Sequence, residues 1–173
     1  MGLELLAAII CAFCLGGIAY GVRRKRQDRL PPWIVPAAAA VGLIGYTVWS
    51  EYSWYPRVAA ELPDGVEVVW AEHAPNALRP WTFLAPLTAR FLAMDTRTLA
   101  VHPSNKDLVL AQVYGFARWR GVEDGFLVVD CAGSRQVRLT ETARITDAGD
   151  LTGAEWVPMA PEDDIRKVAC QEG

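Results

Sequence analysis

Four cysteines carry the most reactive side chains of this sequence, and they fall into two pairs. Cys11 and Cys14 form a Cys-x-x-Cys pair, a spacing that thiol oxidoreductases and metal sites use in soluble settings. Both lie near the middle of an apolar stretch, where a thiolate would be buried in hydrocarbon. We therefore expect them to pack as small apolar residues. A membrane thiol oxidoreductase that uses this pair is the alternative.

The second pair, Cys131 and Cys170, lies in the polar remainder of the chain. Cys131 ends a predicted strand, and Cys170 lies close to the C-terminus. An oxidising compartment would join the two. Closure of a loop of about forty residues stabilises a domain by roughly 3–4 kcal/mol in the chain-entropy treatment.

Other candidates for chemistry are weak. His73 and His102 have no cysteine or carboxylate at metal-ligand spacing, so we expect no metal site. The sequence has no Gly-x-Ser-x-Gly motif and no glycine-rich phosphate loop. We therefore expect no catalytic residues and no cofactor, and an enzyme is the less favoured class. Arg118 and Arg120, which flank Trp119, are interpreted as a solvated strand end.

One proline-rich segment, residues 74–86, has no periodic pattern of apolar residues, and its ends are not polar. It contains Arg79, Trp81 and Phe83 close together. We expect a loop that packs over the core. The alternative is a loop that contacts the bilayer or a partner, so these three residues are the candidate partner-binding site.

The elements that position these residues begin with two apolar stretches. The composition is 52% hydrophobic with a mean hydropathy of +0.14, and the excess lies in residues 1–55. Residues 5–22 and 30–50 contain no charged side chain, and each is long enough to cross roughly 30 Å of hydrocarbon. The sequence predicts transmembrane helices over about 3–22 and 31–52. Small residues recur at four-residue spacing, Gly17 with Gly21 and Ala38 with Gly42, and predict close packing of the two helices.

The link between the two helices is strongly basic. It is short and polar, so it predicts an antiparallel hairpin with these five cations at its turn: Arg23, Arg24, Lys25, Arg26 and Arg29. Positive residues favour the cytoplasmic side of a membrane. Both termini are then expected in the periplasm, as in a multi-pass protein of a bacterial inner membrane.

Residues 56–173 are expected to form a small antiparallel β-rich domain of the α+β class, outside the cytoplasm. Short runs rich in β-branched and aromatic residues predict strands over 66–70, 89–94, 108–119, 126–131 and 136–140. A final helix is predicted over 161–170, with its apolar face on the sheet. Residues 51–173 hold 12 basic and 18 acidic residues, a formal charge of −6, so nucleic acid is not an expected ligand.

The C-terminal third resembles the bacterial surface-adhesin protein E family, a small exported β-rich module. The similar features are Val129-Asp130-Cys131 at a strand end, the basic and apolar strand at 135–139, Trp156 with its following prolines, and the terminal Val168-Ala169-Cys170. The resemblance implies the fold and a Cys131–Cys170 disulfide. It is not extended to adhesion, because a helical hairpin precedes the module here.

The expected function follows from an anchored, acidic, disulfide-linked domain without catalytic residues. We expect a non-catalytic membrane-anchored protein whose periplasmic domain binds a membrane or periplasmic protein, as an accessory or assembly subunit of an envelope complex. Its other expected contact is the lipid bilayer. A thiol oxidoreductase and a ligand-sensing or adhesion module are the alternatives.

Overall fold

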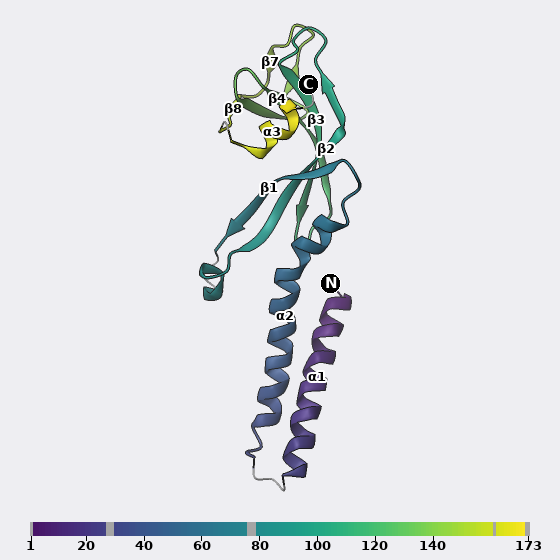
Figure 1. Cartoon of the computed structure of the whole chain (residues 1–173), viewed down its shortest axis with the longest axis vertical. Helices are drawn as coiled ribbons and strands as arrows, with labels where there is room; N and C mark the ends of the chain where they lie inside the picture. Colours follow the sequence, from purple (N-terminus) through teal and green to yellow (C-terminus); the bar gives the residue numbers. More distant parts are fainter. Residues whose placement is uncertain (1, 27–29, 76–78, 161, 172–173) are drawn as a thin grey trace. The chain divides into compact units, whose positions relative to one another are not determined.

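The chain forms two compact units, Met1–Arg57 and Val58–Gly173. The computed structural model describes residues 2–26, 30–75, 79–160 and 162–171. The first unit is a pair of apolar helices, and the second contains an antiparallel sheet and a short helix (Figure 1). Two N-terminal helices followed by an antiparallel β-rich domain were predicted from the sequence, and this arrangement is confirmed.

Both N-terminal helices are longer than predicted. Helix α1 runs Gly2–Lys25 and helix α2 runs Ile34–Ala60. The last turn of α1 includes three of the basic residues, which interact favourably with the negative end of a helix dipole. Helix α2 continues through Pro56, which cannot donate a backbone hydrogen bond to the preceding turn.

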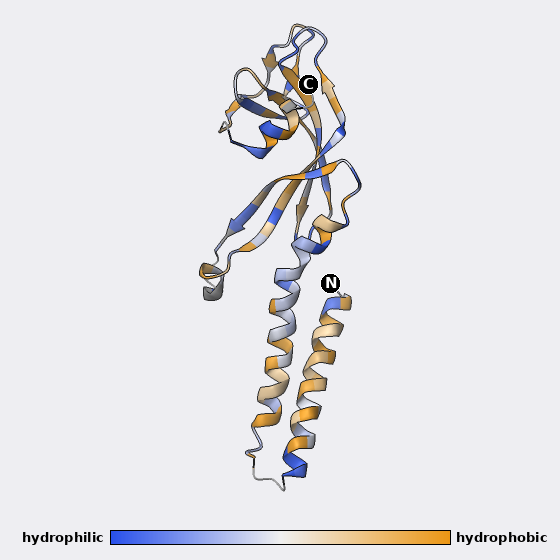
Figure 2. Cartoon of the chain, in the orientation of Figure 1, coloured by the Kyte–Doolittle hydropathy of each residue, from blue (hydrophilic) through white to orange (hydrophobic). Residues whose placement is uncertain are grey.

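The two helices are long and apolar enough to cross a membrane. Figure 2 shows apolar residues along most of α1, and hydrophilic residues only at its two ends. Large apolar side chains such as Leu5, Phe13 and Ile18 are exposed on its surface. The hairpin therefore presents an apolar exterior.

The helices pack against each other at two glycines. A Cβ built on Gly42 would lie 2.7 Å from the backbone oxygen of Cys11, and one built on Gly16 would lie 3.3 Å from the Cβ of Ala39. Such approaches are possible only because glycine lacks a side chain. Gly42 was predicted at this interface. The prediction for Gly17 and Gly21 was wrong, because both are exposed and a Cβ on either would meet nothing within 4 Å.

Enlarging Gly42 is expected to separate the helices. Gly42→Ile forces a branched side chain into the backbone of α1, and overpacking of this kind costs about 1–3 kcal/mol. Gly45→Ile, on the same helix with open space around its Cβ position, is the matched control.

The measurement is cross-linking between α1 and α2. Gly16→Cys with Ala39→Cys places two Cβ atoms close to the separation that a disulfide needs. In a background where the native cysteines of α1 are serines, oxidation of this pair should be nearly complete and should fall several-fold with Gly42→Ile. An equal loss with Gly45→Ile would refute the assigned packing.

The second unit is built on one six-stranded sheet. Its strand order is β1-β2-β3-β4-β5-β8, and all neighbours are antiparallel. These strands are β1 Val66–Ala74, β2 Leu87–Val101, β3 Leu108–Ala117, β4 Glu123–Asp130, β5 Arg135–Leu139 and β8 Val157–Pro158. A two-stranded hairpin of β6 Arg144–Ile145 and β7 Leu151–Thr152 lies between β5 and β8 in sequence. The five predicted strands correspond to β1–β5.

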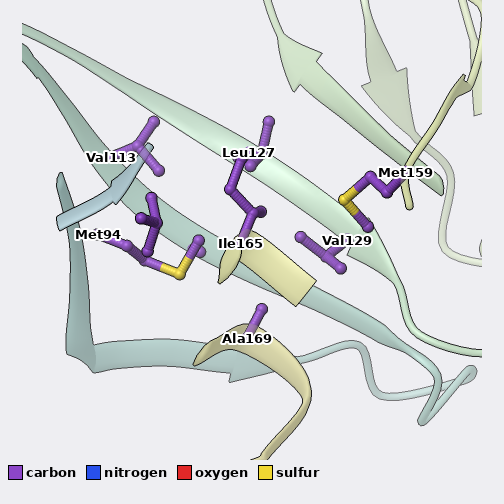
Figure 3. Close-up of a cluster of buried hydrophobic side chains, with 9 residues drawn as sticks. Met94, Val113, Leu127, Val129, Met159, Ile165 and Ala169 are labelled. Atoms are coloured by element: carbon purple, nitrogen blue, oxygen red, sulfur yellow. The ribbon is translucent and has the colours of Figure 1, made fainter. Parts of the chain in front are cut away.

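Helix α3, Asp164–Gln171, packs on one face of this sheet. Its N-cap is Asp163, whose Oδ1 accepts a hydrogen bond from the backbone N–H of Ile165 at 3.0 Å. The buried cluster beneath it is Val69, Met94, Ala111, Val113, Leu127, Val129, Met159, Ile165 and Ala169 (Figure 3). The predicted C-terminal helix on the sheet is thus confirmed, while its predicted first residue, Pro161, lies outside the described residues.

The opposite face of the sheet has a smaller core. Leu108, Val128 and Val137 are buried there, and Ile145 and Leu151 of the β6–β7 hairpin pack against them. The two faces therefore alternate along β3 and β4 with the period of two that a strand imposes. Both faces are apolar in the middle of the sheet, so neither strand shows a simple alternation of polar and apolar residues.

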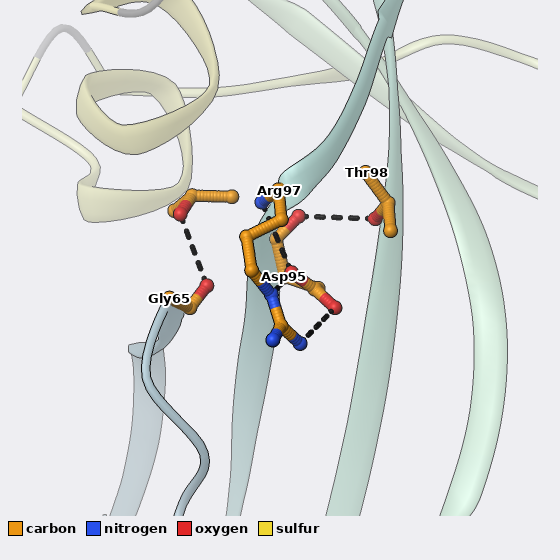
Figure 4. Close-up of polar contacts among 5 residues, drawn as sticks. Gly65, Asp95, Arg97 and Thr98 are labelled. Atoms are coloured by element: carbon orange, nitrogen blue, oxygen red, sulfur yellow. Dashed lines mark hydrogen bonds and ion pairs between the residues drawn. The ribbon is translucent and has the colours of Figure 1, made fainter.

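A polar cluster bends strand β2 near its middle (Figure 4). The carboxylate of Asp95 accepts hydrogen bonds from the Nε and Nη2 atoms of Arg97, at 3.0 and 2.9 Å, and from its backbone N–H. The backbone oxygen of Gly65 accepts from the N–H and Oγ1 of Thr96, which connects the start of β1 to the bend. Pairing with β3 is irregular between Asp95 and Ala100.

Asp95 makes the stability of the β domain depend on pH. The Arg97 guanidinium, which donates hydrogen bonds to the carboxylate, holds the pKa of Asp95 below its ordinary value. A depressed native pKa stabilises the fold above the pKa of the unfolded chain, and this stabilisation is lost as the pH falls through the native pKa. Asp95→Asn should therefore be less stable than the wild type at pH 7, and the difference should be smaller at about pH 3, which lies below the ordinary pKa of an aspartate.

Denaturant titration of the full chain at both pH values, followed by tryptophan fluorescence, tests this expectation. Glu67→Gln, which changes an exposed carboxylate of β1, is the control and should have little effect at either pH. A difference between Asp95→Asn and the wild type that persists unchanged in acid would contradict the role of the ionised carboxylate.

Candidate functional site

The two cysteine pairs lie in different environments. A disulfide joins Cys131, which follows β4, to Cys170 in α3, with the Cα atoms 5.9 Å apart. The predicted bond is therefore present. Cys11 and Cys14 are free thiols on α1. Cys11 is half-buried where Gly42 approaches its backbone, and Cys14 is exposed on the helix surface.

Metal coordination finds no support in the described residues. Within residues 2–26, 30–75, 79–160 and 162–171, no group of three or more His, Cys, Asp or Glu side chains is arranged to hold a metal ion. The Nδ1 of His73 donates to the backbone oxygen of Ala71 at 3.1 Å, and the Nδ1 of His102 accepts the N–H of Ser104 at 3.3 Å. Each imidazole thus contacts its own strand or loop.

The predicted basic link lies at the turn of the hairpin. Arg23, Arg24 and Lys25 form the last turn of α1, and Arg26 follows it. The Nε of Arg23 donates to the backbone oxygen of Leu30 at 3.2 Å. Arg29 lies outside the described residues.

The predicted partner-binding loop connects β1 to β2. It contains a short 3-10 helix, Pro80–Phe83, in which the backbone oxygen of Arg79 accepts hydrogen bonds from the N–H and Oγ1 of Thr82, at 2.9 and 2.7 Å. Phe83 is 63% exposed and Leu84 is 92% exposed. Trp81 belongs to the 3-10 helix, and its side chain lies outside the described part. Phe83 and Leu84 therefore point away from the core, whereas Thr82 beside them is buried, so the loop packs over the core only in part.

A second loop at the same end of the sheet exposes further apolar side chains. The β3–β4 turn follows Ala117, and the N–H of Arg118 bonds to the oxygen of Ala89 near the start of β2. Trp119 is 50% exposed and Val122 is also exposed. We refer to the exposed set of Phe83, Leu84, Trp119 and Val122 as the apolar end of the sheet.

Trp119 is held in an unfavourable backbone conformation. Its φ is +69°, in the left-handed region where bulky residues are rare. The guanidinium of Arg118 lies 4.6 Å from the centre of the indole ring. An aromatic residue therefore occupies a position that glycine would occupy at lower conformational cost. Strain of this kind often marks a functional residue.

Beside the apolar end, a groove of about 610 Å³ opens on the face of the sheet that also carries α3. Six side chains from four strands and the β3–β4 turn give it its character, and we call it the charged groove: Trp70, Glu72, Arg90, Arg120, Glu123 and Arg138. Strand register brings them together, since Glu72 is paired with Arg90 and Arg138 with Leu127. Both signs of charge thus line one aromatic groove.

Glu72 and Arg90 form the fixed pair of the groove. The Nε and Nη2 of Arg90 donate to the two carboxylate oxygens, and its guanidinium lies 5.9 Å from the centre of the Trp70 ring. The hydrogen bonds from Arg90 lower the pKa of Glu72, and the same bonds raise the pKa of Arg90. Arg90 is exposed and Glu72 is half-buried, so this pair orders the groove more than it stabilises the fold.

The charged groove was not predicted from the sequence. Trp70, Arg90 and Arg138 are separated by many residues, and only the register of β1, β2 and β5 places them on one face. The one sign of the groove in the sequence is that charged side chains interrupt otherwise apolar strands. The interpretation of Arg118 and Arg120 as a strand end was close, because β3 stops at Ala117 and both lie in the turn that follows.

Comparison of the chain with protein-family models, curated proteins and solved structures found no match in any of the three. The resemblance of the C-terminal third to the surface-adhesin family therefore remains a prediction.

Proposed function

We propose that this protein is a multi-pass protein of a bacterial inner membrane with both termini in the periplasm. Its β domain would bind a protein partner through the apolar end and the charged groove. The protein acts without catalysis, as an accessory or assembly subunit of an envelope complex. The exposed aromatic, aliphatic and arginine side chains at one end of the sheet are the observation on which the proposal of a partner depends.

Three features support the membrane topology. The apolar exterior of the α1–α2 hairpin is stable in hydrocarbon and would be costly in water. The basic residues cluster at the hairpin turn, which favours a cytoplasmic turn. The Cys131–Cys170 disulfide suits an oxidising compartment such as the periplasm.

Reporter fusions test the topology. Alkaline phosphatase, which folds only outside the cytoplasm, should be active when fused after residue 173 and inactive when fused within the hairpin turn. Replacement of all five link cations by neutral residues should reduce the difference in phosphatase activity between the two fusions, because these charges set the orientation of the hairpin in the membrane. Activity of the phosphatase only at the turn would overturn the proposed location of the β domain.

The composition of the apolar end and groove supports a protein partner. Trp and Arg often supply much of the binding energy at protein interfaces. The residues that surround them at such interfaces contribute little binding energy. Trp70 and Trp119 are about half exposed, and Arg120 and Arg138 lie in the groove beside them. An acidic domain that gathers arginines in one groove is suited to a partner with acidic side chains.

Photo-cross-linking in cells tests the partner. A photoreactive amino acid at Leu84 of the full chain should give a discrete protein adduct, and Arg138→Glu should reduce it at least tenfold by reversing a groove charge. The same label at Lys106, in the β2–β3 connection at the other end of the sheet, is the control and should give none. Adducts with lipid alone, or an adduct insensitive to Arg138→Glu, would refute the proposed interface.

Trp119→Gly separates binding from stability. Glycine relieves the left-handed φ but loses the Arg118 contact, so the free energy of unfolding should stay within about 1 kcal/mol of the wild type. The cross-linked adduct should nevertheless be lost, because the exposed indole is removed. Thermal unfolding and cross-linking of the same preparation measure the two effects. A variant that keeps the adduct would show that Trp119 is not part of the interface.

A further inference from the structure

A second cavity, of about 520 Å³, lies on the face of the sheet opposite to α3. Its floor is Leu108 and Leu110 of β3, with Val128 and Leu139 from the next two strands. Its volume falls in the range of small-molecule sites, and its lining is mainly aliphatic. It shares no residue with the charged groove.

One wall of this cavity is the segment between β5 and β6, and its position is fixed by close backbone packing. A Cβ on Gly153, which follows β7, would lie 1.8 Å from the backbone oxygen of Thr142. The N–H of Ala143 donates to Oγ1 of Thr140 at 3.2 Å. The wall is therefore formed before any ligand arrives, which reduces the entropy lost on binding.

The polar groups that line the cavity are suited to an anion. Arg144 lines it together with His102, and no acidic side chain does, although the domain has a large excess of carboxylates. Glu141 of the same wall segment is not part of the lining. Because the Nδ1 of His102 accepts the N–H of Ser104, a neutral imidazole carries its proton on Nε2 and can donate it.

We propose that this cavity binds a single-chain amphiphile with a carboxylate head group, such as a fatty acid. The chain would lie along the leucine and valine floor, and the carboxylate would meet Arg144 and the Nε2–H of His102. Burial of each methylene is worth roughly fourfold in affinity, so binding should strengthen with chain length until the cavity is filled. This inference does not depend on the proposed protein partner, which uses the other face.

The test uses the full chain in nanodiscs and a fatty acid that carries a diazirine in its chain. Photolabelling should be found on peptides from β3 or from residues 139–145, and excess dodecanoate should compete for it. Dodecanol, with the same chain and no charge, should compete at least tenfold less well. Equal competition by dodecanol would overturn the assignment of an anionic head group.

Two variants locate the site. Arg144→Glu should reduce labelling at least tenfold, and Arg120→Glu, the same change in the charged groove, should leave it unchanged. Val101→Trp should also block labelling, since Val101 lines the cavity from an exposed position and the indole would occupy it without disturbing the core. Unchanged thermal unfolding confirms that each variant is folded. Labelling confined to α1 and α2, or unaffected by Arg144→Glu and Val101→Trp, would refute the site.

Discussion

Replacement of Met94 by alanine is expected to lower the free energy of unfolding of the β domain by about 2–5 kcal/mol. Met94 is 0% exposed and lies in the cluster between the sheet and α3, beside Val113 and Ile165 (Figure 3). Its removal loses the apolar contacts of the side chain and leaves a cavity that the packed neighbours fill only in part.

Denaturant unfolding of the full chain, followed by tryptophan fluorescence, measures this loss. Leu84→Ala is the control, since it removes a side chain of similar size from a position that is almost completely exposed. Its effect should stay within about 0.5 kcal/mol. Similar effects of the two variants would show that the Met94 cluster is not the core of the domain.

Loss of the disulfide is the second change with a large expected effect. Cys131→Ser with Cys170→Ser should lower the free energy of unfolding by about 3–4 kcal/mol, because the unfolded chain regains the freedom of a loop of some forty residues. The bond also holds α3 to the end of β4, so its loss should expose the α3 face of the sheet. A reducing agent should produce the same loss in the wild type and none in the double variant.

The free thiols of α1 provide the matched control. Cys11→Ser with Cys14→Ser changes two cysteines in the hairpin and should leave the unfolding of the β domain unaltered. If the α1 thiols exchanged with the disulfide of the β domain, this variant would change the redox state of Cys131 and Cys170. An identical pattern of reduction with and without the α1 thiols would exclude such exchange.

Local chemistry explains which elements were predictable. The helices followed from long uncharged stretches, and strands β1, β3, β4 and β5 followed from β-branched and aromatic runs. The prediction for β2 covered only 89–94 of Leu87–Val101. The polar run from Asp95 to Thr98 is typical of a turn, but bonds from Arg97 to Asp95 and from Thr98 Oγ1 to the Asp95 oxygen satisfy it inside a bent strand.

Long-range contacts explain what could not be predicted. The spacing of small residues indicated that the helices approach closely, but it did not distinguish Gly16 from Gly17, because one residue rotates the contact by about 100° around the helix. The short strands β6, β7 and β8 have two residues each and no periodicity to detect. The two cavities depend on the register of several strands and on the position of the β6–β7 hairpin.

The two borders of the sheet limit pairing with another copy of the chain in different ways. The border at β1 is long, but its pairing with β2 shifts twice, between Val68 and Trp70 and between Glu72 and His73, and the border at β8 has only two residues, one of them proline. Neither border offers a regular row of hydrogen-bonding groups to a neighbouring copy. In the proposed membrane location, molecules concentrated in the plane of a bilayer would meet often, and these irregular borders would keep such collisions from growing into fibrils.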